Sequence, residues 1–159
     1  MNTRKYALVV AVTTWVLLLV ACASPPPPPK PTVVRIDLTA SATVNADVTG
    51  RGMPVVVRYY LLQSTGAFDS ADYFSLFERD DTLLGASKVL REELTLRPGQ
   101  SHSVELRPLG DAHALGVFVA YRDFNQTLWR ATAPVPQNMT TSYSIQVDRN
   151  SVSITPRAR

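Results

Sequence analysis

Apolar and polar residues alternate along much of the chain after residue 32. Alternation with a period of two is typical of β-strands that bury one face and expose the other. It occurs in four segments, with apolar positions at Val34, Ile36 and Leu38; Val104 and Leu106; Tyr143, Ile145 and Val147; and Val152 and Ile154. Segments 53–62 and 115–124 are more continuously apolar and predict central strands covered on both faces. Segments 88–96 and 127–135 bring the number of predicted strands to about eight.

Short turn sequences separate these strands. The segment Arg-Pro-Gly-Gln at 97–100 predicts a tight hairpin turn, and the segment 148–151 predicts another between the last two strands. About eight short strands with turns at this spacing predict an all-β fold, a two-sheet antiparallel β-sandwich.

The segment 69–77 departs from the alternation. Ala71, Phe74 and Phe77 are spaced three apart, Asp69 stands where a helix N-cap is expected, and Asp72 lies near the N3 position. The segment therefore predicts a short amphipathic helix inserted between the second and third strands. We expect its aromatic side chains to pack on the sandwich rather than to face a ligand.

The start of the chain has a different composition. Arg4 and Lys5 precede an apolar run over 6–18, and Leu-Val-Ala at 19–21 leads to Cys22, the single cysteine. A positive region, an apolar region and a small residue before the cut are the parts of a signal peptide. The apolar run is shorter than the roughly 20 residues of a spanning helix, so an uncleaved membrane helix is the weaker alternative. The segment resembles a bacterial lipoprotein signal.

This resemblance implies cleavage before Cys22 and acylation of its thiol. Two or three acyl chains would anchor the protein stably, whereas one chain gives only marginal binding. Residue 23 is alanine and not the aspartate that signals retention at the inner membrane in many lipoproteins, which implies the outer membrane, facing the periplasm.

Three regions follow from these patterns: a lipoprotein signal peptide over 1–21, a lipidated cysteine and proline-rich tether over 22–31, and a β-sandwich domain over 32–159. The tether contains Ser-Pro-Pro-Pro-Pro-Pro-Lys-Pro at 24–31. This sequence favours polyproline II and would span roughly 25 Å, at ~3.1 Å per residue. A ligand for a proline-binding domain is the alternative interpretation.

Charge and candidate chemistry exclude several classes of function. The chain has 16 basic and 13 acidic residues, and removal of 1–21 would leave 14 basic ones, so nothing favours a nucleic-acid partner. His102 and His113 lack the three or four converging ligands of a zinc site. The Asp-Asp pair at 80–81 predicts a solvated helix cap, and no catalytic motif is present. We expect no enzyme activity, no cofactor and no metal.

Several side chains near the predicted strand ends have more than one interpretation. Phe118 and Tyr121 have opposite parity in one strand and cannot share a face, so they and Trp129 predict core packing rather than a sugar-stacking platform. The charged residues Arg122, Asp123 and Arg130 would either pair with one another or take part in an interface.

An ordered set of segments carries a second resemblance: Val-Val-Val-Arg-Tyr-Tyr-Leu-Leu-Gln-Ser at 55–64, Phe-Asp-Ser-Ala-Asp-Tyr-Phe-Ser-Leu-Phe at 68–77, Leu-Arg-Pro-Gly at 96–99, Gly-Val-Phe-Val-Ala-Tyr-Arg-Asp-Phe at 116–124 and Trp-Arg-Ala at 129–131. Together, behind a lipoprotein signal, they resemble the type VI secretion outer-membrane lipoproteins, the TssJ (SciN) family. The resemblance implies a transthyretin-like β-sandwich with a small helical addition. It also implies docking of its loops onto the periplasmic domain of the inner-membrane protein TssM, in a complex with TssL.

The segment 41–54 is a long polar connection between two strong strands, and long loops on a rigid scaffold often carry binding sites. In the resembled family the loop between the first two strands contacts TssM. We therefore expect partner contacts from Asn45 and Asp47 (polar), Arg51 (charge), and Val48 and Met53 (apolar). The alternative is a solvated loop that merely turns at its glycines.

Two functions compete. The first is a structural adaptor that binds TssM and catalyses nothing, and the second is a periplasmic binding module for a small lipid, glycan or peptide. A hydrolase is disfavoured because the chain lacks the histidine and arginine constellation of the transthyretin-like hydrolases and their tyrosine-containing tail.

Overall fold

The computed structural model of the protein describes residues 27–108 and 110–157. The predicted signal peptide, Cys22 and the first part of the tether lie outside the described residues. The elements are β1 (Val33–Ala40), β2 (Val55–Leu62), α2 (Gly66–Ser70), α3 (Tyr73–Leu84), the 3-10 turn η1 (Gly85–Ser87), β3 (Lys88–Leu96), β4 (Ser101–Leu106), β5 (Ala114–Val119), the 3-10 turn η2 (Phe124–Gln126), β6 (Arg130–Pro134), β7 (Thr140–Val147) and β8 (Val152–Pro156). No helix of the described part is long and apolar enough to cross a membrane.

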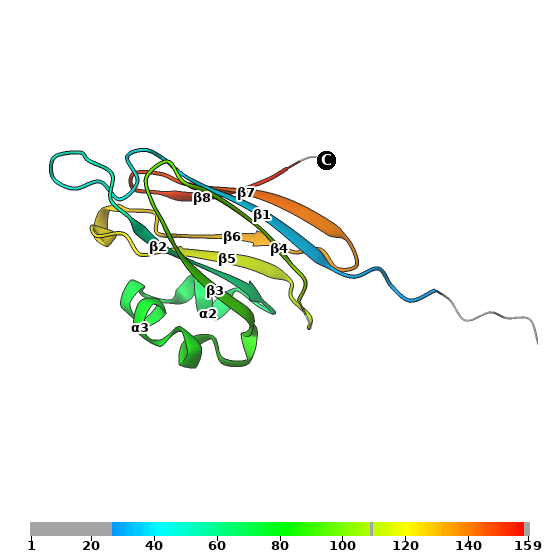
Figure 1. Ribbon diagram of the computed structural model, residues 1–159. Coiled ribbons are helices and arrows are strands. Elements are labelled where there is room, and N and C mark those ends of the chain that lie inside the picture. Colours follow the sequence, from blue (N-terminus) through cyan, green and yellow to red (C-terminus); the bar gives the residue numbers. More distant parts are fainter. Residues whose placement is uncertain (1–26, 109, 158–159) are drawn as a thin grey trace, which may run out of the picture.

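The strands form two four-stranded sheets, with orders β4-β1-β7-β8 and β3-β2-β5-β6. The two sheets face each other, and helices α2 and α3 cover the outer face of the second (Figure 1). This arrangement confirms the predicted sandwich and the position of the helical insertion between β2 and β3. One pairing, between β1 and β7, is parallel, whereas the other neighbours in both sheets run antiparallel.

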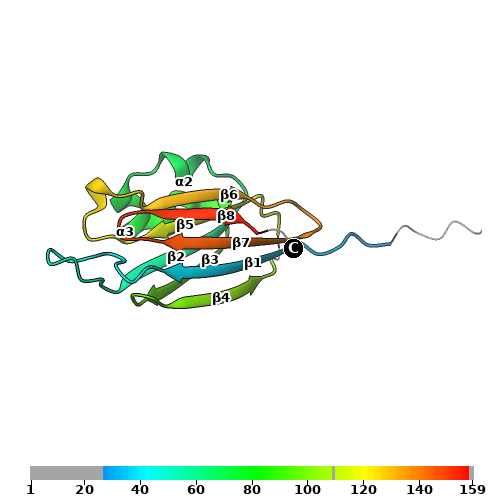
Figure 2. The ribbon, with the colours of Figure 1, turned by 90° about the horizontal axis from the view of Figure 1, so that it is seen from above.

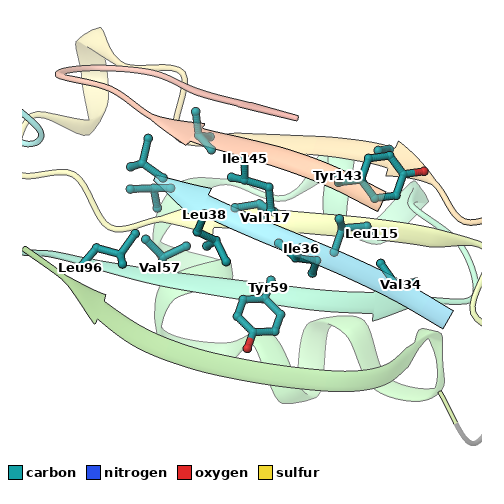
Figure 3. Close-up of a cluster of buried hydrophobic side chains, with 14 of the residues drawn as sticks. Val34, Ile36, Leu38, Val57, Tyr59, Leu96, Leu115, Val117, Tyr143 and Ile145 are labelled. Atoms are coloured by element: carbon teal, nitrogen blue, oxygen red, sulfur yellow. The ribbon is translucent and has the colours of Figure 1, made fainter. Parts of the chain in front are cut away.

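The main core lies between the sheets and is built from the alternating positions of the strands. In β1 the side chains of Val34, Ile36 and Leu38 are buried, and those of Tyr143 and Ile145 in the neighbouring strand β7 lie beside them on the same face of the sheet (Figure 3). The intervening polar residues point outward because successive side chains of a strand alternate between faces. The period-two segments of the sequence are therefore strands with one buried face, as predicted.

A second core lies between the β3-β2-β5-β6 sheet and the helices. Tyr60 and Phe118 point into it, so β2 and β5 are covered on both faces, as their continuous apolar sequences predict. Tyr121 belongs instead to the core between the sheets, which confirms that it and Phe118 face opposite sides. A Cβ at Gly116 would lie 3.2 Å from the ring of Phe68, so the strand and α2 approach closely at this position.

The helical segment differs from the prediction in its register. It contains two helices, and the N-cap of α3 is Asp72, whose carboxylate accepts a hydrogen bond from the amide of Ser75 at 2.9 Å; Asp69 lies inside α2. With that start, Tyr73 and Leu76 are buried. Ala71 is buried as predicted. The predicted packing of Phe74 and Phe77 is only partial: they are 51% and 39% exposed, while the ring of Phe77 lies 6.2 Å from that of Phe118 in β5 and the ring of Phe74 lies 4.9 Å from that of Phe124.

Asp80 was expected in a solvated cap, but it is buried on the inner side of α3. Its carboxylate accepts hydrogen bonds from the Tyr60 hydroxyl at 2.8 Å and from Nε of Arg91 at 2.7 Å. Nη1 of Arg58 lies 3.8 Å from the same oxygen. These partners lie on β2 and β3, so the carboxylate fastens the helix to the sheet. Asp81 is exposed and pairs with Lys88.

The turn at 97–100 is tight, with a hydrogen bond of 3.0 Å from the amide of Gln100 to the carbonyl of Arg97 and a positive φ of 74° at Gly99. It is not the predicted hairpin turn, because β3 and β4 belong to different sheets. The chain instead crosses from one sheet to the other here. The turn at 148–151 does join two paired strands, β7 and β8, as predicted.

Candidate protein-interaction site

The sandwich has two ends that differ in character. Four connections meet at one end, which we call the loop end: the β1–β2 loop (41–54), the β3–β4 turn (97–100), the β5–β6 connection (120–129) and the β7–β8 turn (148–151). Residues 27–32 leave the sandwich from the opposite end, the tether end (Figures 1 and 2). The β1–β2 loop extends furthest from the body in both views, away from the tether.

The β1–β2 loop folds back on itself as a small hydrogen-bonded ribbon. The amide of Met53 donates to the carbonyl of Val44, and the amide of Asp47 donates to the carbonyl of Arg51, both at 2.9 Å. The turn between these pairs contains Gly50 at φ 82°, a conformation that favours glycine. The long polar segment is thus an ordered structure with its own backbone pairing.

The carboxylate of Asp47 organises the tip of this ribbon. One oxygen accepts hydrogen bonds from the amide and hydroxyl of Thr49 and from the amide of Arg51, at 2.9, 2.6 and 3.0 Å. The other lies 3.5 Å from Nε of Arg51. The hydrogen bond from the Thr49 hydroxyl is the main cause that holds the pKa of Asp47 below its usual value, with the backbone hydrogen bonds and the Arg51 charge adding to it. The carboxylate therefore stays ionised and is occupied internally.

The base of the loop is fixed to the sandwich. Val44 is fully buried and belongs to the core between the sheets. The side chain of Asn45 is also buried; its amide nitrogen donates to the carbonyl of Pro54 at 3.0 Å, and its oxygen accepts from the amide of Arg122 at 2.9 Å. Asn45 has a φ of 49°, which asparagine adopts more readily than most residues. Asn45 thus ties the β1–β2 loop to the β5–β6 connection.

The five residues predicted to contact a partner have different environments. Val48 is completely exposed at the tip, and the Arg51 side chain is 76% exposed. Asp47 and Met53 are half-buried, and Asn45 points inward and uses its polar atoms within the protein. The loop brings Asp47, Val48 and Arg51 together, while Asn45 holds the loop in place.

A cleft of about 450 Å³ opens between the β1–β2 loop on one side and the β5–β6 connection and β7–β8 turn on the other. The lining is mostly polar and comes from all three connections: Asn45, Ala46, Asp47, Val48, Tyr121, Arg122, Asp123, Gln126, Thr127, Arg149 and Asn150. Sequence reasoning missed the cleft because its lining comes from three separate segments, 45–48, 121–127 and 149–150, that are distant along the chain. One signal was available in a β-sandwich: the connections that follow β1, β5 and β7 all begin at the same end of the domain, so their residues could be expected to lie close together.

Other candidate residues of the sequence have structural contacts. Nη1 of Arg130 donates to the carbonyls of Phe68 and Ala71 at 3.0 and 2.6 Å, and its guanidinium lies 4.6 Å from the Trp129 ring. Arg130 therefore holds α2 against the sheet rather than pairing with its charged neighbours. His102 and His113 are exposed. Over residues 27–108 and 110–157, no group of three or more histidine, cysteine or acidic side chains could hold a metal.

Comparison with known proteins gives a consistent result. Residues 32–150 match the family described as "Type VI secretion lipoprotein, VasD, EvfM, TssJ". A comparison with curated proteins gives no significant match.

Solved structures with the same fold include the T6SS lipoprotein TssJ1 from Pseudomonas aeruginosa, which is 32% identical, with a TM-score of 0.78, over 81% of this chain and 98% of that chain. A chain in a structure of the type VI membrane complex is 26% identical, with a TM-score of 0.69, over 80% of this chain and 100% of that one. A chain in a structure of the T6SS protein TssM C-terminal domain from EAEC is 27% identical, with a TM-score of 0.64, over 79% and 99% of the two chains.

Proposed function

Because this chain belongs to the type VI secretion lipoprotein (TssJ) family, we propose that it is the outer-membrane-anchored adaptor of a type VI secretion membrane complex. In this proposal it binds the periplasmic domain of TssM through its loop end, stands in the same complex as TssL, and catalyses no reaction. The anchor is the acylated Cys22, after removal of residues 1–21, and residues 22–31 form the tether.

One observation carries the proposal: the exposed tip of an ordered loop stands at the end of the domain opposite the tether (Figure 1). Val48 is completely exposed there, although apolar side chains gain most from burial. The turn that carries it is held by hydrogen bonds from the amides of Thr49 and Arg51 to the Asp47 carboxylate, so the loop loses little conformational freedom on binding. A domain anchored at one end presents this tip away from its own membrane.

The comparisons support the choice of partner. The two related chains noted above come from structures described as a type VI membrane complex and as the C-terminal domain of TssM. A protein of this family with an ordered, exposed loop is well suited to bind the same component.

The test is a titration of the full chain, extracted in detergent, against the periplasmic domain of TssM. Replacement of Val48 by Asp places a charge at the tip and should weaken binding by tenfold or more, because hot-spot residues at interfaces commonly contribute at least 2 kcal/mol. Met139→Asp is the matched control, since Met139 is 48% exposed in the β6–β7 connection at the tether end. If Val48→Asp binds TssM tightly and Met139→Asp loses binding, the interface lies at the tether end and the proposal is wrong.

The competing binding-module function would use the cleft at the loop end. Small-molecule sites are mostly lined by apolar and aromatic side chains, with a few polar groups for orientation. The cleft instead has a mostly polar lining with four charged residues, Asp47, Arg122, Asp123 and Arg149. This composition favours a protein loop as the occupant. A small molecule found by native mass spectrometry on the extracted protein, without a protein partner, would favour the module.

A further inference from the structure

The arginines of the described residues fall into two groups. Most have partners for their guanidinium groups: Arg35, Arg51, Arg58, Arg91, Arg107 and Arg157 form ion pairs, Arg79 donates to the Ser75 hydroxyl, and Arg130 donates to backbone carbonyls. Within the described ranges, three guanidinium groups have no such partner: Arg97, Arg122 and Arg149. All three lie at the loop end, so the guanidinium groups of the described residues that have neither an ion pair nor a hydrogen bond are gathered there.

Arg122 and Arg149 line the same cleft from different connections, whereas Arg97 lies in the β3–β4 turn and does not line it. Asp47, on the opposite wall, is occupied by Thr49 and Arg51 and cannot neutralise them without breaking the loop. Asp123 forms no ion pair with either arginine in the described structure. The cleft therefore has two free guanidinium groups and one free carboxylate.

The backbone around these arginines is held in place. The amide of Arg122 donates to the buried Asn45 side chain, and Arg149 occupies a tight turn closed by a hydrogen bond of 2.8 Å from the amide of Asp148 to the carbonyl of Ser151. The Tyr121 hydroxyl bonds to the carbonyls of Asp148 and Ser151, at 3.0 and 2.6 Å, and so joins the two connections. The two guanidinium groups thus project from backbones with a fixed relative position.

We propose that this cleft receives an acidic loop of the partner, with a carboxylate held between Arg122 and Arg149. The proposal rests on the proposed function, because it names the chemistry of the TssM segment that this end of the domain would bind. Guanidinium groups bind carboxylates through two parallel, charge-assisted hydrogen bonds, which makes them suited to recognise such a group.

Two probes separate this inference from the proposed function. The first is a synthetic hexaglutamate peptide, titrated against the full chain in detergent and monitored by NMR or by fluorescence of a dye on the peptide. The second is the periplasmic domain of TssM. Each probe is tested on the parent, on Arg122→Glu/Arg149→Glu, on Asp123→Asn and on Arg97→Glu, with a thermal melt of every variant to show that these exposed substitutions leave the fold intact.

We expect the double variant to lose binding of both probes by at least tenfold, and Arg97→Glu to change it by less than about threefold, because the latter alters only the long-range field. Asp123→Asn should bind equally or more tightly, since it removes a negative charge from the cleft. Binding of both probes should also weaken as salt increases.

The inference is overturned if hexaglutamate does not bind the parent protein. It is also overturned if Arg97→Glu loses as much binding as the double variant, or if Asp123→Asn loses binding of TssM. It is also overturned if the double variant binds TssM as tightly as the parent. If the peptide behaves as expected and no variant or parent binds TssM, the acidic specificity of the cleft stands and the proposed function fails.

Discussion

Replacement of Asp80 by Asn is expected to destabilise the domain, because the carboxylate uses both oxygens. One accepts from the Tyr60 hydroxyl and from Nε of Arg91, and the other accepts from the amide of Asp81 at 3.1 Å. An amide group has only one acceptor oxygen, so whichever way it turns, a nitrogen faces a donor. The substitution keeps the volume and removes the charge, which isolates the polar contribution.

The size of the effect follows from the surrounding contacts. Removal of one partner of a buried ion pair costs about 3–5 kcal/mol when the remaining charge is left alone. Here Arg58 and Arg91 both keep an ion pair with Glu93, at 2.7 Å each, so neither is left unpaired. We therefore expect the lower part of that range, about 3 kcal/mol, which is a large part of the 5–15 kcal/mol typical of a domain.

The effect should also depend on pH. Burial alone would raise the pKa of Asp80, but the hydrogen bonds from Tyr60 and Arg91 and the charges of Arg91 and Arg58 outweigh it and hold the pKa below its usual value. A group with a lowered pKa in the folded state adds stability above its unfolded pKa and loses it as the pH falls. The difference between parent and Asp80→Asn should therefore be complete near pH 7 and shrink below about pH 4.

The measurement is urea unfolding of the chain from residue 27 onward, followed by the fluorescence of Trp129, the single tryptophan of that range. Tyr60→Phe is the matched variant; it removes one hydrogen bond and should cost about 1 kcal/mol. The double variant Asp80→Asn/Tyr60→Phe should lose less free energy of unfolding than the sum of the two single variants, since the two residues are in contact. If Asp80→Asn lowers the free energy of unfolding at pH 7 by less than about 0.5 kcal/mol, with an unchanged dependence on urea concentration (m-value), the reasoning is refuted.

Three further predictions concern other parts of the chain. Cys22→Ser should release the protein from the outer membrane with its fold intact, and unchanged flotation with outer membranes would contradict the anchor. Asn45→Ala should lower the free energy of unfolding by about 2 kcal/mol, because it removes two buried hydrogen bonds and alanine disfavours the positive φ of this residue. Asn45→Gly should cost less, since glycine tolerates that φ; equal urea midpoints for the two variants would count against this. Gly116→Val should destabilise by about 1–3 kcal/mol through overpacking against Phe68, whereas Gly66→Ala, where an added Cβ meets open space, should be close to neutral by the same assay.

The strands were predictable because a half-buried strand is a local pattern. The alternation of Val34, Ile36 and Leu38 with polar residues is sufficient to identify β1 and its inward face. It contains no information about which strand lies beside it, so the parallel pairing with β7 was not predicted. The same limit applies to the turn at 97–100, whose sequence suits either a hairpin or a crossing between sheets.

The helix register and the role of Asp80 depend on contacts distant in sequence. Asp69 and Asp72 are both acceptable N-caps, and only the docking of Tyr73 against Phe118 and Phe124 decides between them. Asp80 resembles a surface acid until Tyr60 and Arg91 come together around it. In these cases tertiary contacts decided between local alternatives of similar energy.

The candidate site was predictable as a segment but not residue by residue. The polar length of the segment 41–54 predicts an exposed loop, and Val48 at its tip is completely exposed, whereas its contact with a partner stays a prediction. Val44 and Asn45 turned out to hold the loop to the core, which no local pattern distinguishes from surface exposure. The cleft needs three connections that only the fold assembles.

Strand β1 follows the tether at Val33 and leads into the β1–β2 loop at Ala40. It is paired with β7 over that whole length and with β4 from Val34 to Thr39. Ladder hydrogen bonds run across the strands, so tension along β1 strains them together rather than one after another. In the proposed arrangement, any pull between TssM and the outer membrane acts along this strand in shear. The sandwich is thereby suited to carry mechanical load between two membranes without peeling open at an edge.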